Sequence, residues 1–123
     1  MAGKNRSFLI GLYHAVDGVK DGFRNERSMR IHVLMAAAVV LCGLLLGLCL
    51  WEWVVCVVLI GLVLAAELLN TSLEEAMDIV SPEYSPGAKR VKDTAAGAVL
   101  IVSLAAAAAG LLIFLPKLWN LFF

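Results

Sequence analysis

Charged residues are scarce in this sequence of 123 residues, which has ten Lys or Arg and ten Asp or Glu, together 16% of the chain. Hydrophobic residues make up 62%, and the mean hydropathy is +0.91. This balance is typical of a membrane protein and leaves too little chain for a separate soluble domain. We therefore predict a single integral-membrane domain over residues 1–123.

The sequence also lacks a cysteine motif and a recognisable cleavable signal peptide. Cys42, Cys49 and Cys56 have no CxxC spacing and no histidine nearby, whereas a metal site needs clustered ligands. We expect ordinary buried thiols that suit helix packing. The first apolar run begins only near residue 33 and continues to full spanning length, unlike the short apolar region of a signal peptide.

Three stretches are long enough to cross a hydrocarbon core of ~30 Å. Residues 33–51 and 94–115 are uncharged, and residues 53–79 cross if their acidic side chains are accommodated. Residues 7–24 place apolar side chains at spacings of three and four, which predicts an amphipathic helix on the membrane surface. The predicted fold class is an all-α membrane protein with three transmembrane helices and an N-terminal surface helix.

Small residues and breakers suggest how the spans begin and end. Gly43 and Gly47 have the small-xxx-small spacing that permits close helix contact. We expect a tight turn around Glu52 before the second span, and an end to the third span at Pro116 and Lys117.

Basic residues predict the topology. They cluster before the first span and between the second and third, and only Lys117 lies on the other side. The N-terminus and the loop at 80–93 are therefore expected in the cytoplasm, with the C-terminus outside. Trp51, Trp53 and Trp119 then fall at the outer interface, as an aromatic belt does. Because the basic residues lie beside lipid, we expect no nucleic-acid partner.

One face of the second span is polar, although no Gly-Pro break separates it from the apolar residues 53–66. An ionisable residue in hydrocarbon costs at least ~2.5 kcal/mol, so a repeated cost on one face indicates chemistry there. At helical periodicity these residues fall within about a third of the circumference. The residues of this polar stripe are Glu67, Asn70, Thr71, Glu74 and Asp78.

Depth along the second span suits a reaction between a water-soluble phosphate donor and a lipid hydroxyl. A helix that starts near Trp53 crosses ~30 Å close to Glu74, so Glu67 lies about two turns deeper. Mg²⁺ on ATP takes hard oxygen ligands, which Glu74 and Glu26 could supply at the boundary. A general base for the hydroxyl should lie deeper, where Glu67 is placed.

Structural roles without a part in catalysis are alternative interpretations of several of these residues. The residues alone favour Glu26 as a solvated interfacial charge neutralised by Arg27 and Arg30. The surface helix is either a simple anchor or also a wall of the nucleotide site, with Gly18 at a close approach. Lys89 and Arg90 read as topology signals, whereas Lys92 could neutralise the transferring phosphate.

Several segments resemble the small bacterial integral-membrane diacylglycerol kinase family, and within it the undecaprenol kinase branch. The stretch from Glu67 to Asp78 is similar to the family signature nearly residue for residue, with Leu73 where isoleucine is more usual. Further likenesses follow in the right order and cover essentially the whole chain. They are Asn25-Glu26, residues 88–93 and Ala95-Ala96-Gly97-Ala98.

The choice of branch depends on fewer residues. Better-known diacylglycerol kinases carry an acidic residue at the position of His32. By contrast, Arg30-Ile31-His32, Glu52-Trp53 and residues 114–117 look like undecaprenol kinases.

The resemblance implies a homotrimer with composite active sites between protomers in the bacterial inner membrane. It implies Glu67 as the catalytic base at the lipid substrate, with Glu26 and Glu74 as ligands of Mg²⁺. Together with Gly18 from the surface helix, the ATP-binding residues would be His14, Glu26, Asn70, Glu74, Glu83, Tyr84, Ser85, Lys92 and Asp93.

The expected function is transfer of the γ-phosphate of MgATP to undecaprenol, giving undecaprenyl phosphate. The alternative is the same chemistry on diacylglycerol, giving phosphatidic acid. A hypothesis from another class is a non-catalytic membrane oligomer whose carboxylates relay protons or cations.

Overall fold

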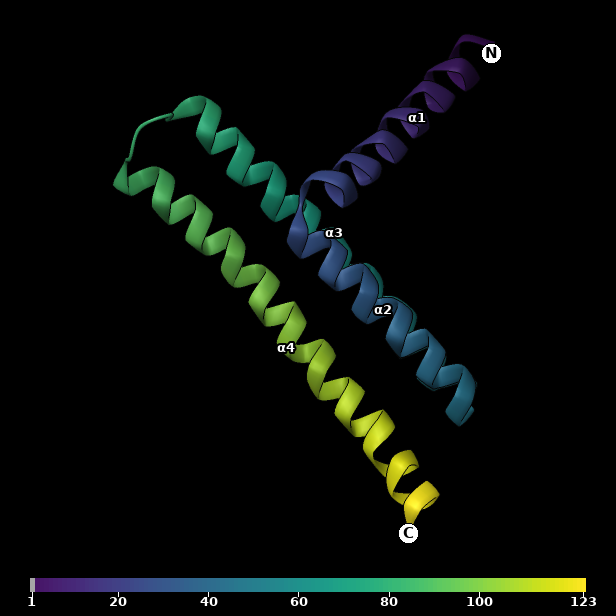
Figure 1. The fold of residues 1–123 in the computed structure, drawn as a ribbon. Coiled ribbons are helices and arrows are strands. Elements are labelled where there is room, and N and C mark those ends of the chain that lie inside the picture. The colour runs from purple at the N-terminus through teal and green to yellow at the C-terminus, as the bar shows by residue number, and fades with distance from the viewer. Residues whose placement is uncertain (1) are drawn as a thin grey trace.

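The computed structural model describes residues 2–123 as four helices (Figure 1). They are α1 (Ala2–Asn25), α2 (Arg27–Leu46), α3 (Leu50–Val80) and α4 (Pro86–Phe122). These residues form no strand, so the all-α prediction is confirmed. The helices α2, α3 and α4 are each long and apolar enough to cross a membrane, so three spans are confirmed. The predicted bounds 33–51 of the first span are wrong, because α2 begins at Arg27 and ends at Leu46, and Trp51 belongs to α3.

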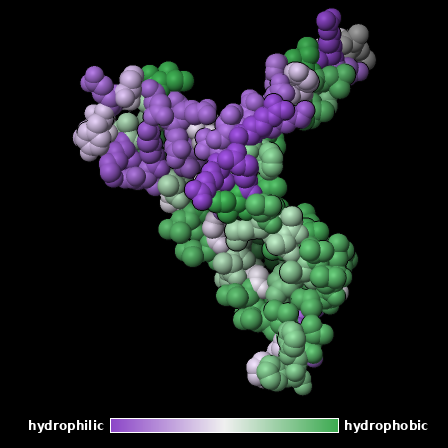
Figure 2. Space-filling view, in the orientation of Figure 1, coloured by the Kyte–Doolittle hydropathy of each residue, from purple (hydrophilic) through white to green (hydrophobic). Residues whose placement is uncertain are grey.

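The helices α3 and α4 lie side by side and antiparallel, and α2 packs on α3 (Figure 1). The helix α1 leaves this bundle at an angle and contacts α2 and α3. Figure 2 shows hydrophilic surface over α1, the end of α3 and the start of α4, whereas the rest of the bundle is largely hydrophobic. The molecule therefore has one polar end and one long apolar body.

The junction between α1 and α2 is a single residue, Glu26, with extended backbone at φ −110° and ψ 118°. Arg30 Nη1 donates to the carbonyl oxygens of Phe23 at 3.3 Å and Arg24 at 2.7 Å. These carbonyls end α1 and have no partner within the helix, so Arg30 stabilises that end. Because α2 already begins at Arg27, His32 lies within a helix.

The turn between α2 and α3 differs from the prediction. Gly47 has φ 75° and ends α2 in the left-handed region, so it is a helix terminator and not a packing residue. Glu52 lies in the first turn of α3, where its Oε1 accepts the N–H of Cys49 at 3.0 Å. The same oxygen lies 3.0 Å from Lys117 Nζ of α4. The turn therefore lies before Glu52, whose side chain links the end of the turn to α4.

The helix α4 is longer than the predicted span at both ends. At its start Ser85 Oγ accepts the N–H of Ala88 at 3.3 Å, and Pro86 occupies the first turn, where its missing N–H costs nothing. The predicted end at Pro116 is wrong, because the helix continues to Phe122. A proline removes one helical hydrogen bond, and membrane helices tolerate this loss.

The cysteines are only partly as predicted. Cys56 is buried with 6% exposure, but Cys42 and Cys49 are exposed on the protomer. The helix α1 also begins earlier than residue 7 and ends at Asn25, and α3 extends the predicted 53–79 by a few residues at its start. Helix ends depend on local caps that an apolar pattern does not report.

Candidate active site

Glu67 is the centre of the candidate site. It lies on α3 and is 4% exposed, the one buried charged residue in the described part of the chain. His32 Nε2 of α2 lies 3.5 Å from Glu67 Oε2, and their side chains are 18% and 6% exposed. A buried carboxylate needs polar partners, and the packing of α2 on α3 supplies this one.

Two further carboxylates lie near Glu67, one from the polar stripe and one from the junction between α1 and α2. His32, Glu74 and Glu26 lie close enough for their charges to act on Glu67. One turn along α3, Asn70 Nδ2 donates to Glu74 Oε1 at 3.3 Å. Asn70 Oδ1 is buried without a hydrogen-bond partner in the protomer. Buried polar atoms normally have a partner, so this oxygen is suited to a bound group.

The donor set fits a magnesium ion that arrives with a phosphate. Glu26 and Glu74 are both half-buried and offer hard carboxylate oxygens. Among residues 2–123 no three His, Cys, Asp or Glu side chains are grouped to hold a metal ion by themselves. Mg²⁺ usually takes one or two carboxylates and completes its shell with water and substrate phosphates. The Glu74 carboxylate beside Asn70, with Glu26 as a second carboxylate of the cluster around Glu67, matches that pattern.

A cleft of about 360 Å³ with both polar and apolar lining residues lies between α1 and α3, and we call it the α1–α3 cleft. Its floor is a close helix contact: a Cβ added at Gly22 would lie 2.6 Å from Leu68 Cδ2. The cleft includes the predicted Gly18 and Glu26. Sequence reasoning missed Gly22, although its spacing of four from Gly18 was a signal. The lining residues of α3 are Leu68, Thr71, Ser72 and Glu75.

A second hollow of about 680 Å³, also with a mixed lining, includes Tyr84 and Asp93, and we call it the α4 groove. Lys89 Nζ lies 2.5 Å from Asp93 Oδ2. Lys92 Nζ instead lies 2.6 Å from Asp78 Oδ1 of α3. Lys92 and Asp93, neighbours in the sequence, therefore belong to separate ion pairs.

The remaining predicted nucleotide residues lie outside both hollows. His14 is exposed on α1, with its ring centre 5.9 Å from that of Tyr13. Glu83 is exposed, and its carbonyl oxygen accepts the hydroxyl of Ser81 at 3.0 Å. Ser85 caps α4. One protomer thus divides the predicted site between the acidic cluster with the α1–α3 cleft and the region around the start of α4.

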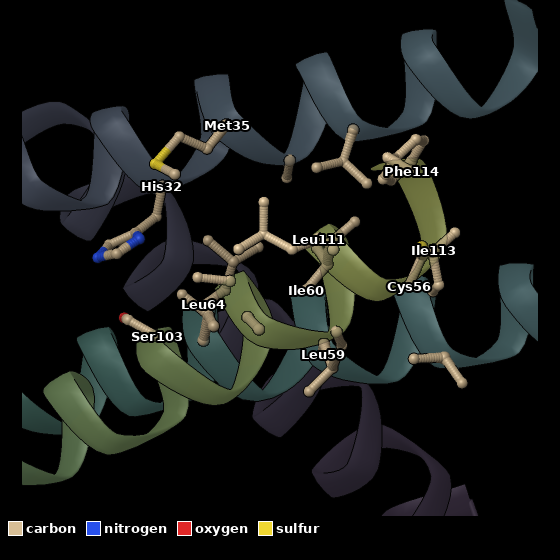
Figure 3. A pocket seen from close by; sticks show the side chains of 18 residues that line it. His32, Met35, Cys56, Leu59, Ile60, Leu64, Ser103, Leu111, Ile113 and Phe114 are labelled. Atoms are coloured by element: carbon tan, nitrogen blue, oxygen red, sulfur yellow. The ribbon is translucent and has the colours of Figure 1, made fainter. Parts of the chain in front are cut away.

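An apolar cavity of about 490 Å³ lies among α2, α3 and α4. Figure 3 shows His32 and Ser103 toward one end of this cavity and Ile113 and Phe114 at the other. Ser103 Oγ is buried without a hydrogen-bond partner in the protomer. His32 lines the cavity and also lies 3.5 Å from Glu67, so a buried carboxylate and a space for hydrocarbon meet at this residue. The arrangement suits proton removal from a lipid hydroxyl.

Comparisons with known proteins agree with this chemistry. The sequence model of the family described as "Prokaryotic diacylglycerol kinase" matches residues 13–114. A protein of Bacillus subtilis (strain 168) named "Undecaprenol kinase" is 41% identical over 111 residues, which cover 90% of this chain and 90% of that protein. A "Diacylglycerol kinase" of Synechocystis sp. is 38% identical over 94% of this chain and 66% of that protein. A "Diacylglycerol kinase" of Helicobacter pylori (strain 26695) is 32% identical over 73% of this chain and 70% of that protein.

Proposed function

This chain belongs to the prokaryotic diacylglycerol kinase family and is a lipid kinase of a bacterial membrane, and we propose that it phosphorylates undecaprenol with MgATP. The product is undecaprenyl phosphate. The high identity to the Bacillus undecaprenol kinase over nearly the full length of both proteins supports this lipid. The observation that carries the reaction is the buried Glu67 carboxylate, which lies 3.5 Å from His32, a residue that lines an apolar cavity.

In the proposed reaction Glu67 takes the proton of the terminal hydroxyl of the lipid. The hydroxyl oxygen then bonds to the γ-phosphorus of ATP while the bond from that phosphorus to the ADP oxygen breaks. A positioned general base contributes about 10²–10⁴-fold to such a step. Most of the remaining gain comes from positioning and from neutralising charge on the phosphate, as in other phosphoryl transfers.

Glu26 and Glu74 would hold the Mg²⁺ of MgATP, and bound Mg²⁺ neutralises charge on the phosphates. Asn70 supports Glu74 through the hydrogen bond described above. We assign the nucleotide to these residues with His14 and Gly18 of α1 on one side. On the other side we assign it to Lys92 with Glu83, Tyr84, Ser85 and Asp93.

The proposed assembly is a homotrimer whose sites are shared between neighbouring protomers. The division of the nucleotide residues between two regions of one protomer supports this idea. Mixed trimers of Glu67→Gln and Asp93→Asn chains test it, because these residues lie in the two separate regions. If both variants are inactive alone, activity returns on mixing only if one protomer supplies Glu67 and its neighbour supplies Asp93. Mixtures that stay inactive would show that each site uses both residues of one chain.

The proposed placement is the bacterial inner membrane, with residues 1–123 as one domain. The N-terminus and the polar end face the cytoplasm, the C-terminus lies outside, and α1 rests on the cytoplasmic surface as an amphipathic helix. The basic residues around α1 and at the start of α4 support this orientation, because Lys and Arg favour the cytoplasmic side. Labelling of single cysteines at Ser7 and Phe123 from each side of vesicles tests it.

Diacylglycerol is the second candidate lipid, because relatives from Synechocystis and Helicobacter are named diacylglycerol kinases. The same residues would act on its hydroxyl. Membership of a kinase family disfavours the hypothesis of a non-catalytic cation pathway.

Transfer of labelled γ-phosphate from MgATP by the purified protein in mixed micelles tests the proposal. Undecaprenol and diacylglycerol are supplied side by side at equal surface concentration. Preference for undecaprenol is the expected result. Preference for diacylglycerol would move the assignment to the other lipid, and absence of labelled lipid from either would overturn it.

A further inference from the structure

His32 is the one polar side chain that connects the apolar cavity to the proposed base. It lines the cavity, and its Nε2 lies 3.5 Å from Glu67 Oε2 across the α2–α3 contact. Its side chain is 18% exposed, in a part of α2 whose following residues are apolar. An ionisable group within a membrane helix is costly, so its presence beside another such group requires an explanation.

We propose that His32 is a positioning residue that holds the Glu67 carboxylate in the orientation needed to accept the proton of the lipid hydroxyl. This inference rests on the proposed function of Glu67 as the base. A carboxylate has two oxygens that accept hydrogen bonds, and histidine can present an N–H from Nε2 in its neutral or charged form. The contact engages Oε2 and leaves Oε1 as the oxygen that receives the proton.

The separation of 3.5 Å is longer than a formed hydrogen bond. Contacts of this kind are often loose before the substrate binds and shorten in the reactive complex. The neighbouring carboxylates of Glu74 and Glu26 also act on Glu67 and repel it. His32 presents an N–H from the opposite helix, so it can hold the Glu67 carboxylate in one orientation.

The test compares His32→Leu, His32→Gln and His32→Asn in the labelled phosphate assay. Glutamine places its amide nitrogen near the position of the histidine Nε2, whereas asparagine is shorter and imitates Nδ1. We expect His32→Leu to lower kcat by about 10–100-fold, the loss typical of a misplaced reactive group, with KM for MgATP unchanged within about twofold. Glutamine should restore most of the kcat, and asparagine should not.

Two further measurements separate positioning from packing. Thermal unfolding in detergent should give the same Tm for the glutamine and asparagine variants, so a difference in their kcat cannot come from stability. In a Glu67→Gln background His32→Leu should cost less than about twofold, because residues that act as a unit are not additive.

The proposal is overturned if His32→Leu keeps at least half of the kcat, or if asparagine and glutamine restore it equally. It is also overturned if His32→Leu costs as much in the Glu67→Gln background as in the wild type. These outcomes would contradict the role of His32 but not the role of Glu67 as the general base. By contrast, full activity of Glu67→Gln alone would remove Glu67 as the base and with it the proposed function of the stripe.

Discussion

Lys92 Nζ of α4 lies 2.6 Å from Asp78 Oδ1 of α3, and this ion pair joins the two helices at the polar end of the molecule. The side chains are 38% and 67% exposed, so the pair contributes no more than about 1 kcal/mol to stability. A cation held this weakly can exchange its carboxylate for a phosphate. The pair therefore adds little to stability and leaves Lys92 available for the nucleotide role that we propose for it.

Lys92→Gln should raise KM for MgATP about tenfold or more, because a hydrogen bond to a charged group contributes ~1.5–3 kcal/mol. Initial rates over a range of MgATP concentrations measure this. Lys117→Gln is the control, since Lys117 pairs with Glu52 near the other end of the bundle and should leave KM unchanged. Equal KM values for Lys92→Gln and wild type would exclude a nucleotide role for Lys92.

Glu67→Gln should lower kcat by about 10²–10⁴-fold while MgATP still binds, because only the proton acceptor is lost. Single-turnover transfer and nucleotide binding measured on the same preparation separate the two effects. Glu52→Gln is the matched control on the same helix, far from the acidic cluster, and should keep its activity. A Glu67→Gln enzyme that retains most of its turnover would contradict the assignment.

Gly22→Leu should weaken the docking of α1 on α3, since even a Cβ at this position meets Leu68 at 2.6 Å. Overpacking of this kind costs ~1–3 kcal/mol, which should appear as a higher KM for MgATP because the α1–α3 cleft deforms. Gly11→Leu on the same helix meets nothing within 4 Å and is the control.

The companion change Leu68→Ala makes room beside Gly22 and should restore part of the affinity of the Gly22→Leu enzyme. If the double variant binds MgATP no better than Gly22→Leu alone, the contact is not the cause of the loss.

Gly47→Ala should destabilise the protein by about 1–2 kcal/mol, because its φ of 75° lies in the left-handed region that a Cβ disfavours. Unfolding in detergent with increasing denaturant measures the change. Gly61→Ala lies within α3 with open space around it and should be neutral or slightly stabilising. Equal losses for the two variants would show that backbone conformation is not the reason.

The helices were predictable because apolar runs and periodicity report directly on burial in lipid. Their ends were not. Gly47 looked like a packing residue because the small-xxx-small spacing does not distinguish helix contact from a helix end. Pro116 looked like a stop, yet α4 continues past it, because one lost hydrogen bond does not outweigh the turns on either side.

In the candidate site, too, features within one helix were predictable and contacts between helices were not. Glu67, Asn70 and Glu74 share a face because they lie at successive turns of one helix, and the sequence contains that information. The contact of His32 with Glu67 depends on how α2 rotates against α3, which no spacing within one helix specifies. Likewise Lys92 pairs with Asp78 across helices and not with its neighbour Asp93.

The unbroken course of α3 has a consequence for the lipid environment. The helix has 31 residues, so at 1.5 Å per residue it is ~46 Å long and exceeds the ~30 Å hydrocarbon core. Glu67 lies at a fixed height of ~26 Å above Leu50, with no hinge between them. A bilayer with longer acyl chains would therefore submerge the carboxylate, and one with shorter chains would raise it toward water. Turnover should accordingly pass through a maximum as the thickness of the host bilayer is varied.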